Sequence, residues 1–140
     1  MRTFGTAIEV LAKPGAYRPQ TRETADHSLP YCLAVGLVEG ALGPEQFAHR
    51  QWENPTIIAL MSRITIVEDD ALTRLYPPAR PADVTIRTVD GTVYRSRVDY
   101  PKGDSRNPMT GQQVETKFRT LVGDFIEQRV APAHAKRSLR

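Results

Sequence analysis

The sequence predicts an α+β fold, with a small antiparallel or mixed sheet and helices packed on one side of it. Residues 82–98 contain Asp90-Gly91, a common hairpin signal, between two β-rich runs. Residues 29–38 form a nearly all-apolar run, which is typical of a buried helix. From Thr110 onwards, a capping pattern precedes an apolar stripe at helical spacing. Helices that are segregated from antiparallel strands define this fold class.

The first elements are bounded by proline and glycine. Residues 4–11 read as a strand that ends at Lys13-Pro14-Gly15, and residues 14–24 read as a loop. Leu29 to Val38 is predicted to be a helix that is buried on every side. Pro30 fits only in the first turn of that helix, so residues 26–28 must supply the cap, and Gly40 ends it.

The middle of the chain predicts two short helices and a strand. One helix begins at Pro44 after Gly43, and Asn54-Pro55 provides an N-cap and a first helical residue for Thr56 to Met61. Residues 63–68 then alternate as a strand that places Ile64 and Ile66 on one face.

The pairing of apolar residues decides the turn of the hairpin. A two-residue loop would pair Ile86 with Arg95 and so set an apolar side chain against a charged one. One more loop residue pairs Val84 with Val98 and Thr88 with Tyr94. The sequence therefore predicts a longer or bulged turn.

The last element is the clearest in the sequence. Thr110-Gly-Gln-Gln113 reads as a capping box. The stripe that follows is expected to pack over a sheet or helix layer, and it comprises Val114, Phe118, Leu121, Val122, Phe125, Ile126 and Val130. We expect residues 1–130 to form the domain and residues 131–140 to be a flexible basic tail.

Composition excludes several classes of protein. The chain has 140 residues, the length of one domain, and its net charge of +3 comes from Lys136, Arg137 and Arg140 at the end. The rest is balanced and has no basic stripe, so we expect no nucleic-acid binding. Cys32 is the only cysteine and reads as a buried thiol. With no apolar run of signal-peptide or membrane-span length, the sequence predicts a soluble cytoplasmic protein that does not bind membranes.

A dense polar cluster carries the first candidate site. Common zinc, nucleotide and serine-hydrolase motifs are absent, which leaves residues 21–31, Thr-Arg-Glu-Thr-Ala-Asp-His-Ser-Leu-Pro-Tyr. If the first helical turn includes His27, then His27 and Tyr31 lie on one face. A helix N-terminus favours a neutral imidazole that can accept a proton, and Tyr31 could donate to developing negative charge. The alternative is a loop whose polar residues only cap the helix.

The second candidate is the loop from Tyr100 to Thr110. It contains Lys102 and Arg106, which together could hold a carboxylate, and Gly103 with two prolines restricts its shape. A solvated connector with incidental charge is an equally good reading of this loop.

At these two segments the sequence resembles the MmgE/PrpD family. Residues 21–31, followed by Ala34-Val-Gly-Leu-Val-Glu-Gly40, resemble the signature stretch of that family. A second block is similar in Tyr100-Pro-Lys-Gly-Asp104, Asn107-Pro108 and Lys117-Phe118. The two motifs occur in the right order and cover nearly the whole chain. The first block is most similar to that of 2-methylcitrate dehydratases.

The resemblance implies a lyase that needs no metal or other cofactor. Such an enzyme removes water from a tricarboxylic acid, 2-methylcitrate, to give 2-methyl-cis-aconitate in the 2-methylcitrate cycle of propionate catabolism. Relatives in the family decarboxylate cis-aconitate or epimerise a related acid. The chemistry needs a base, an acid and cations. His27 and Tyr31 match positions near the family's active site, so we take them as catalytic candidates, and Lys102, Arg106 and Arg22 as candidates for substrate binding.

The resemblance also implies a missing part. Family members begin with a large helical domain that supplies much of the pocket, and this chain contains none of it. We therefore expect a domain truncated on its N-terminal side that is inactive without the helical domain in cis or in trans. A homodimer is a further expectation. Two alternatives from other classes are a non-catalytic association module and a stand-alone binder of small carboxylic acids.

Overall fold

The computed structural model describes the backbone of residues 1–135 and the side chains of residues 1–123. The chain divides into two compact units, Met1–Pro101 and Lys102–Arg140, each of which is described by itself. The first unit contains α1 (Gly5–Leu11), α2 (Arg22–Asp26), α3 (Leu29–Glu39), α4 (Pro55–Met61) and α5 (Asp70–Thr73). Short 3₁₀ helices lie at Pro14–Tyr17, Pro44–Phe47 and Gln51–Glu53.

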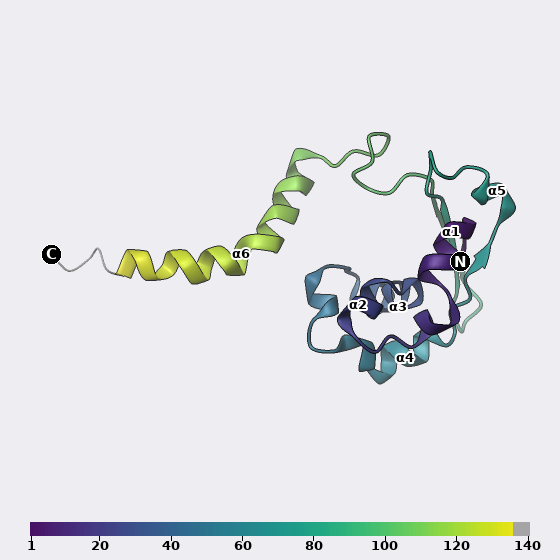
Figure 1. The fold of residues 1–140 in the computed structure, drawn as a ribbon, viewed down its shortest axis with the longest axis horizontal. Coiled ribbons are helices and arrows are strands. Elements are labelled where there is room, and N and C mark those ends of the chain that lie inside the picture. The colour runs from purple at the N-terminus through teal and green to yellow at the C-terminus, as the bar shows by residue number, and fades with distance from the viewer. Residues whose placement is uncertain (136–140) are drawn as a thin grey trace. The chain divides into compact units, whose positions relative to one another are not determined.

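A four-stranded mixed sheet completes the first unit. Its strands are β1 (Arg2–Thr3), β2 (Val67–Glu68), β3 (Ala82–Arg87) and β4 (Val93–Val98), in the spatial order β2-β1-β3-β4. β1 is parallel to β2 and antiparallel to β3, and β3 and β4 form the antiparallel hairpin. Helices and a mixed sheet together confirm the predicted α+β class (Figure 1).

The hairpin has the longer turn that the sequence predicts, but in another register. The amide of Gly91 donates to the carbonyl of Thr88, and the amide of Thr88 donates to the carbonyl of Thr92, both at 3.0 Å. Gly91 has φ 85°, the left-handed conformation of a three-residue hairpin turn. Val84 therefore pairs with Ser96, not with Val98, because the loop ends at Gly91. The predicted pairing of Thr88 with Tyr94 is wrong for the same reason, and Ile86 pairs with Tyr94.

The core lies between α3 and α4. Its buried residues are Ala25, Tyr31, Ala34, Val35, Trp52, Ile57 and Met61. The predicted caps of both helices are confirmed, with Ser28 before α3 and Asn54 before α4. The prediction that the first of these helices is buried on every side is wrong for its last turn, where Leu37 is 49% and Val38 44% exposed.

Three predicted elements near the chain start and middle are corrected. Residues 5–11 form helix α1, and only Arg2 and Thr3 form a strand. Residues 14–24 are not a loop throughout, because they contain a 3₁₀ helix and the start of α2. The strand predicted for residues 63–68 is reduced to Val67 and Glu68.

Residues 4 and 5, at the start of α1, lie against distant parts of the chain. A Cβ on Gly5 would lie 2.5 Å from the carboxylate of Glu68, so a larger residue here would require that side chain to move. Phe4 stacks on Tyr76 at a ring distance of 4.6 Å. The side chain of Arg2 forms ion pairs with Asp69 and Asp83, which ties β1 to the chain that follows β2 and to β3. These partners lie more than 60 residues away, so local pattern could not indicate them.

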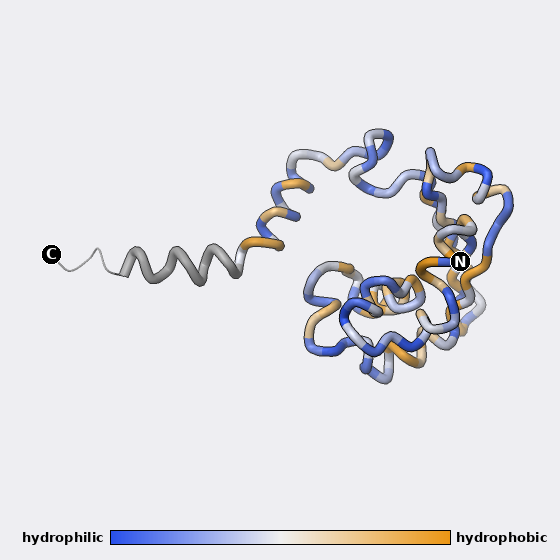
Figure 2. The backbone as a smooth tube through the Cα atoms, in the orientation of Figure 1, coloured by the Kyte–Doolittle hydropathy of each residue, from blue (hydrophilic) through white to orange (hydrophobic). Residues whose placement is uncertain are grey.

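The second unit contains the long helix α6 (Gly111–Ala135). The predicted capping box is confirmed: the amide of Gln113 donates to the Thr110 hydroxyl at 3.2 Å, and the amide of Thr110 donates to the Gln113 side chain at 2.9 Å. Apolar and polar residues alternate along its first turns (Figure 2). Val114, Phe118 and Leu121 are 54%, 59% and 53% exposed, so these side chains of the apolar stripe are not covered by the residues that the structure describes.

Two of the predictions concern the end of the chain. Helix α6 continues to Ala135, into the stretch that was expected to be a tail, and residues 136–140 lie outside the described residues. The side chains of Phe125, Ile126 and Val130 also lie outside them. In the described part of the chain, no helix has the length and apolar character that crossing a membrane requires.

Replacing Gly40 by alanine should lower the free energy of unfolding by about 1–2 kcal/mol. Gly40 ends α3 with φ 70°, a conformation that costs an L-residue energy. The matched control is Gly36→Ala, in the interior of the same helix with open space beside its Cα. That change should raise the stability by about 0.5–1 kcal/mol. Urea denaturation followed by circular dichroism measures both, and a stabilising Gly40→Ala would contradict the left-handed end of α3.

Candidate active site

The polar cluster of residues 21–31 forms a junction between two helices. Thr21 caps α2 through a reciprocal pair of bonds with Thr24: the amide of Thr21 donates to the Thr24 hydroxyl at 2.9 Å, and the amide of Thr24 donates back at 3.2 Å. Arg22, the first residue of α2, is exposed. His27 closes α2, and Ser28 precedes α3. Capping, the alternative reading of the sequence, is therefore a real part of this cluster.

Ser28 is the buried centre of the junction. Its hydroxyl accepts a hydrogen bond from the amide of Tyr31 at 3.1 Å and donates one to the carbonyl of Ala16 at 2.5 Å. The side chain is fully buried. The start of α3 is thus fixed both to its own first turn and to the 3₁₀ helix before α2.

Tyr31 points into the core. The residue has no exposed surface, and its hydroxyl donates a hydrogen bond to the carbonyl of Gln46. Its ring lies 5.7 Å from that of Phe47, at an interplanar angle of 58°. Burial, with smaller contributions from Cys32 and Glu39, raises the pKa of Tyr31 to about 12. Tyr31 is therefore a neutral donor whose proton is already shared with a backbone carbonyl.

His27 lies outside the core. The residue is exposed, and its Nδ1 lies 3.0 Å from the carbonyl of Glu23. A carbonyl can only accept, so Nδ1 carries the proton in this contact and Nε2 is left as the acceptor when the ring is neutral. α3 begins at Leu29, so the condition under which His27 and Tyr31 would share a helix face is not met. The Tyr31 ring is buried and the His27 residue is exposed, so the two side chains do not face a common opening.

Cys32 follows Tyr31 in α3. It is half-buried, and its Sγ lies 4.0 Å from the carbonyl of Ala25. Burial, with a smaller contribution from Asp26, raises the pKa of the Cys32 thiol to about 11. A protonated thiol is a poor nucleophile, so Cys32 behaves as the small apolar residue that the sequence indicated.

The second candidate segment belongs to the other unit. The Arg106 guanidinium binds the Asp104 carboxylate through two bonds, of 2.9 and 3.1 Å. These bonds hold the pKa of Asp104 down at about 2. The ammonium of Lys102 lies 3.5 Å from the Asn107 side-chain oxygen. A substrate carboxylate at Arg106 would have to compete with Asp104.

A hollow of about 480 Å³ beside Lys102 adds a residue that the sequence analysis did not assign. It is lined by Lys102, Met109, Gln112, Gln113, Thr116 and Lys117. In the sequence, Lys117 belongs to the second family block, and no role was predicted for it. Helical spacing could have identified it, because Lys117 lies one turn after Gln113 on the side of α6 that meets the loop. Two ammonium groups and two amides form a surface suited to a carboxylate.

The predicted site residues thus fall into two groups. His27, Tyr31 and Arg22 belong to the unit Met1–Pro101, and Lys102 and Arg106 belong to the unit Lys102–Arg140. Within the first unit, Ser28 was missed as a central residue, although a serine just before a proline-containing first turn is the sequence signal of an N-cap.

Comparison with known proteins places the chain in a family. A model of the MmgE/PrpD C-terminal domain matches residues 1–139. A 2-methylcitrate dehydratase of Cupriavidus necator is 37% identical over 127 residues, covering 86% of this chain and 26% of that protein. The 2-methylcitrate dehydratase of Escherichia coli K12 is 30% identical over 79% of this chain and 24% of its own length. A cis-aconitate decarboxylase of Mus musculus is 24% identical over 77% of this chain and 22% of its own.

The α+β fold and this family match together define the class of MmgE/PrpD C-terminal domains. The chain belongs to the MmgE/PrpD family, as the resemblance implied. It spans about a quarter of the length of the curated relatives that it matches.

The raised pKa of Tyr31 predicts a loss of stability in alkaline solution. A phenol whose pKa rises from 10.0 to about 12 on folding contributes stability below pH 10, and this contribution disappears as the pH rises from about 10 to 12. Tyr31→Phe removes that contribution and leaves the Gln46 carbonyl without its donor. The variant should be less stable at pH 8 by about 1–3 kcal/mol and should lose less on going to pH 12.

The measurement is urea denaturation at several pH values. Tyr94→Phe is the matched control, because Tyr94 is 59% exposed and its substitution should leave both quantities unchanged. Equal slopes of stability against pH for Tyr31→Phe and the unaltered chain would contradict the buried phenol.

Proposed function

We propose that this chain is the C-terminal domain of a metal-independent hydro-lyase that dehydrates 2-methylcitrate to 2-methyl-cis-aconitate. The observation that carries the proposal is the family match over residues 1–139, together with two named 2-methylcitrate dehydratases among the relatives. The helix junction at His27 and Ser28 supports it, because it presents an imidazole with a free acceptor nitrogen beside a precisely capped helix start.

In this proposal His27 is the general base. Its Nδ1–H is held by the Glu23 carbonyl, so Nε2 can accept the proton on the carbon next to a carboxylate. Tyr31 is the proposed acid for the leaving hydroxyl. Its pKa of about 12 keeps the phenol protonated at neutral pH. Because its hydroxyl is bonded to Gln46, this role requires that bond to be exchanged for one to the substrate.

Cations are needed to hold the substrate carboxylates. Arg22 is exposed on α2, and we assign it to this role together with Lys102 and Arg106. Lys117 joins them, since it lines the same hollow as Lys102. Because Arg106 already binds Asp104, Lys102 and Lys117 are the better-supported pair.

A helical partner domain is the second part of the proposal. This chain matches only 26% of the length of the Cupriavidus necator relative, and the apolar stripe of α6 is exposed at Val114, Phe118 and Leu121. Such a stripe needs a cover. We propose that the family's helical domain covers it, in the same polypeptide or as a separate one, and that the chain has no lyase activity without it. A homodimer, a cytoplasmic location and a role in propionate catabolism belong to the same proposal.

Two other functions have specific support. The two lysines at the hollow favour a binder of small carboxylic acids that acts without chemistry. The similarity to a cis-aconitate decarboxylase favours a related proton transfer on another acid, either decarboxylation or epimerisation. A purely associating module would use the α6 stripe alone.

The test is reconstitution. The chain is mixed with the part of the Cupriavidus necator relative that this chain does not match, and hydration of 2-methyl-cis-aconitate is followed. We expect activity only in the mixture. In the reconstituted enzyme, His27→Asn should lower kcat by about 100-fold or more, because general-base catalysis contributes that much. Lys102→Gln should mainly raise KM.

The matched control for the histidine is His49→Asn. His49 is exposed and has φ 50°, a conformation that asparagine tolerates, so this change should leave kcat unaltered. Full activity of His27→Asn in a mixture that is otherwise active would remove the proposed base. Binding of citrate by the isolated chain well below millimolar, without catalysis in the mixture, would favour the acid binder.

A further inference from the structure

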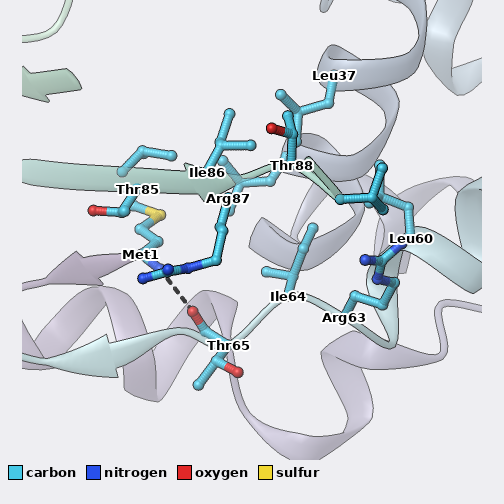
Figure 3. Close-up of a pocket in the computed structure, with 13 residues that line it drawn as sticks. Met1, Leu37, Leu60, Arg63, Ile64, Thr65, Thr85, Ile86, Arg87 and Thr88 are labelled. Carbon is cyan, nitrogen blue, oxygen red and sulfur yellow. Dashed lines mark hydrogen bonds between the residues drawn. The ribbon is translucent and has the colours of Figure 1, made fainter. Parts of the chain in front are cut away.

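A groove of about 420 Å³ lies in the first unit, away from the hydrogen bonds of the helix junction. It is formed by α3, by α4 with the residues that follow it, and by β3 (Figure 3). Its apolar lining comes in same-face pairs from three elements, namely Leu33 and Leu37, Leu60 and Ile64, and Val84 and Ile86. The exposed fraction of Leu37, 49%, shows that this wall is open to solvent.

The charge of the groove is of one sign. Arg63 and Arg87 line it, and its lining includes no aspartate or glutamate. Neither guanidinium forms an ion pair with any residue that the structure describes. Figure 3 shows Arg87 extending from β3 towards Met1 and Thr65, whereas Arg63 lies at the other end, beside Leu60. An apolar floor between two cationic ends is an amphipathic surface.

We infer that this groove binds a medium-chain aliphatic carboxylate, with its chain against the leucine, isoleucine and valine walls and its carboxylate on an arginine. The volume lies in the range of small-molecule sites, about 300–1,000 Å³. A tricarboxylic acid has almost no apolar part, so this ligand class differs from the proposed substrate. The groove is lined by 13 residues, fewer than the roughly 20–30 residues that each side of a standard protein interface contributes.

The inference goes beyond the proposed function and does not rest on it. A carboxylate at an arginine without an acidic partner gains a charge-assisted hydrogen bond, which places the head group. The aliphatic chain of the ligand then adds affinity in proportion to its buried length. Each buried methylene should tighten binding roughly fourfold. An ionic contact alone would not show this dependence, because it is the same for every chain length.

Isothermal titration calorimetry of the full chain tests both halves of the inference. The probes are hexanoate, octanoate and decanoate, with octanamide as the neutral analogue. We expect saturable binding of decanoate below about 1 mM, affinity that rises roughly fourfold per methylene along the series, and octanamide at least about tenfold weaker than octanoate. Equal affinities along the series, or equal binding of acid and amide, would overturn the inference.

The arginines are tested by a double variant, Arg63→Gln with Arg87→Gln. Both residues are exposed, so the fold should tolerate the change, which circular dichroism checks. Octanoate should bind at least about tenfold more weakly to it. Arg74→Gln, an exposed arginine outside the groove, is the control and should bind octanoate like the unaltered chain. A folded double variant with unchanged affinity would refute the site.

Discussion

The start of α3 depends on the buried hydroxyl of Ser28. Through one oxygen it caps α3 and bonds the carbonyl of Ala16, so the 3₁₀ helix before α2 and the start of α3 meet at a single atom. This contact makes Leu29 the first residue of α3. Tyr31, two residues further, then turns inward to the core, while His27 stays outside at the end of α2. A polar atom with no exposed surface must be bonded, which makes this arrangement hard to change locally.

Hydrogen bonding already commits most polar groups of the junction. Thr21 and Thr24 cap each other, and the Nδ1 of His27 is held by Glu23. The phenol of Tyr31 is bonded to Gln46. Of the site residues predicted in this unit, His27 keeps its Nε2 and Arg22 its guanidinium outside these hydrogen bonds. Capping and catalysis are therefore not exclusive readings of the same residues, since capping orients the groups that stay free.

Helix caps and helix ends could be predicted from neighbouring residues, whereas contacts between residues distant in the sequence could not. The capping box at Thr110, the end of α3 at Gly40 and the proline in its first turn depend on neighbouring residues, and all three are confirmed. The ion pairs of Arg2 with Asp69 and Asp83, which fix β1 just before the helix at residues 5–11, join residues that are distant in the sequence. The hairpin register depends on where the loop ends: Thr88 bonds to Thr92 and not to Tyr94, so every pair of the hairpin differs from the predicted one. For the site, the polar cluster was found, but the burial of Tyr31 depends on core partners that are remote in the sequence.

The proposed acid role of Tyr31 requires its hydrogen bond to Gln46 to break. Its proton is held by Gln46, whose own side chain is fixed by bonds to the amide of Gly43 and to Glu39, both at 2.8 Å. Breaking the Tyr31 bond without replacement costs about 1–3 kcal/mol. Contact of another domain with the Pro44–Phe47 turn could offset a cost of that size, because a partner that binds one of two arrangements shifts their populations by its difference in affinity. In the proposed function, the Tyr31 phenol would therefore be released as an acid only when the partner domain is in place.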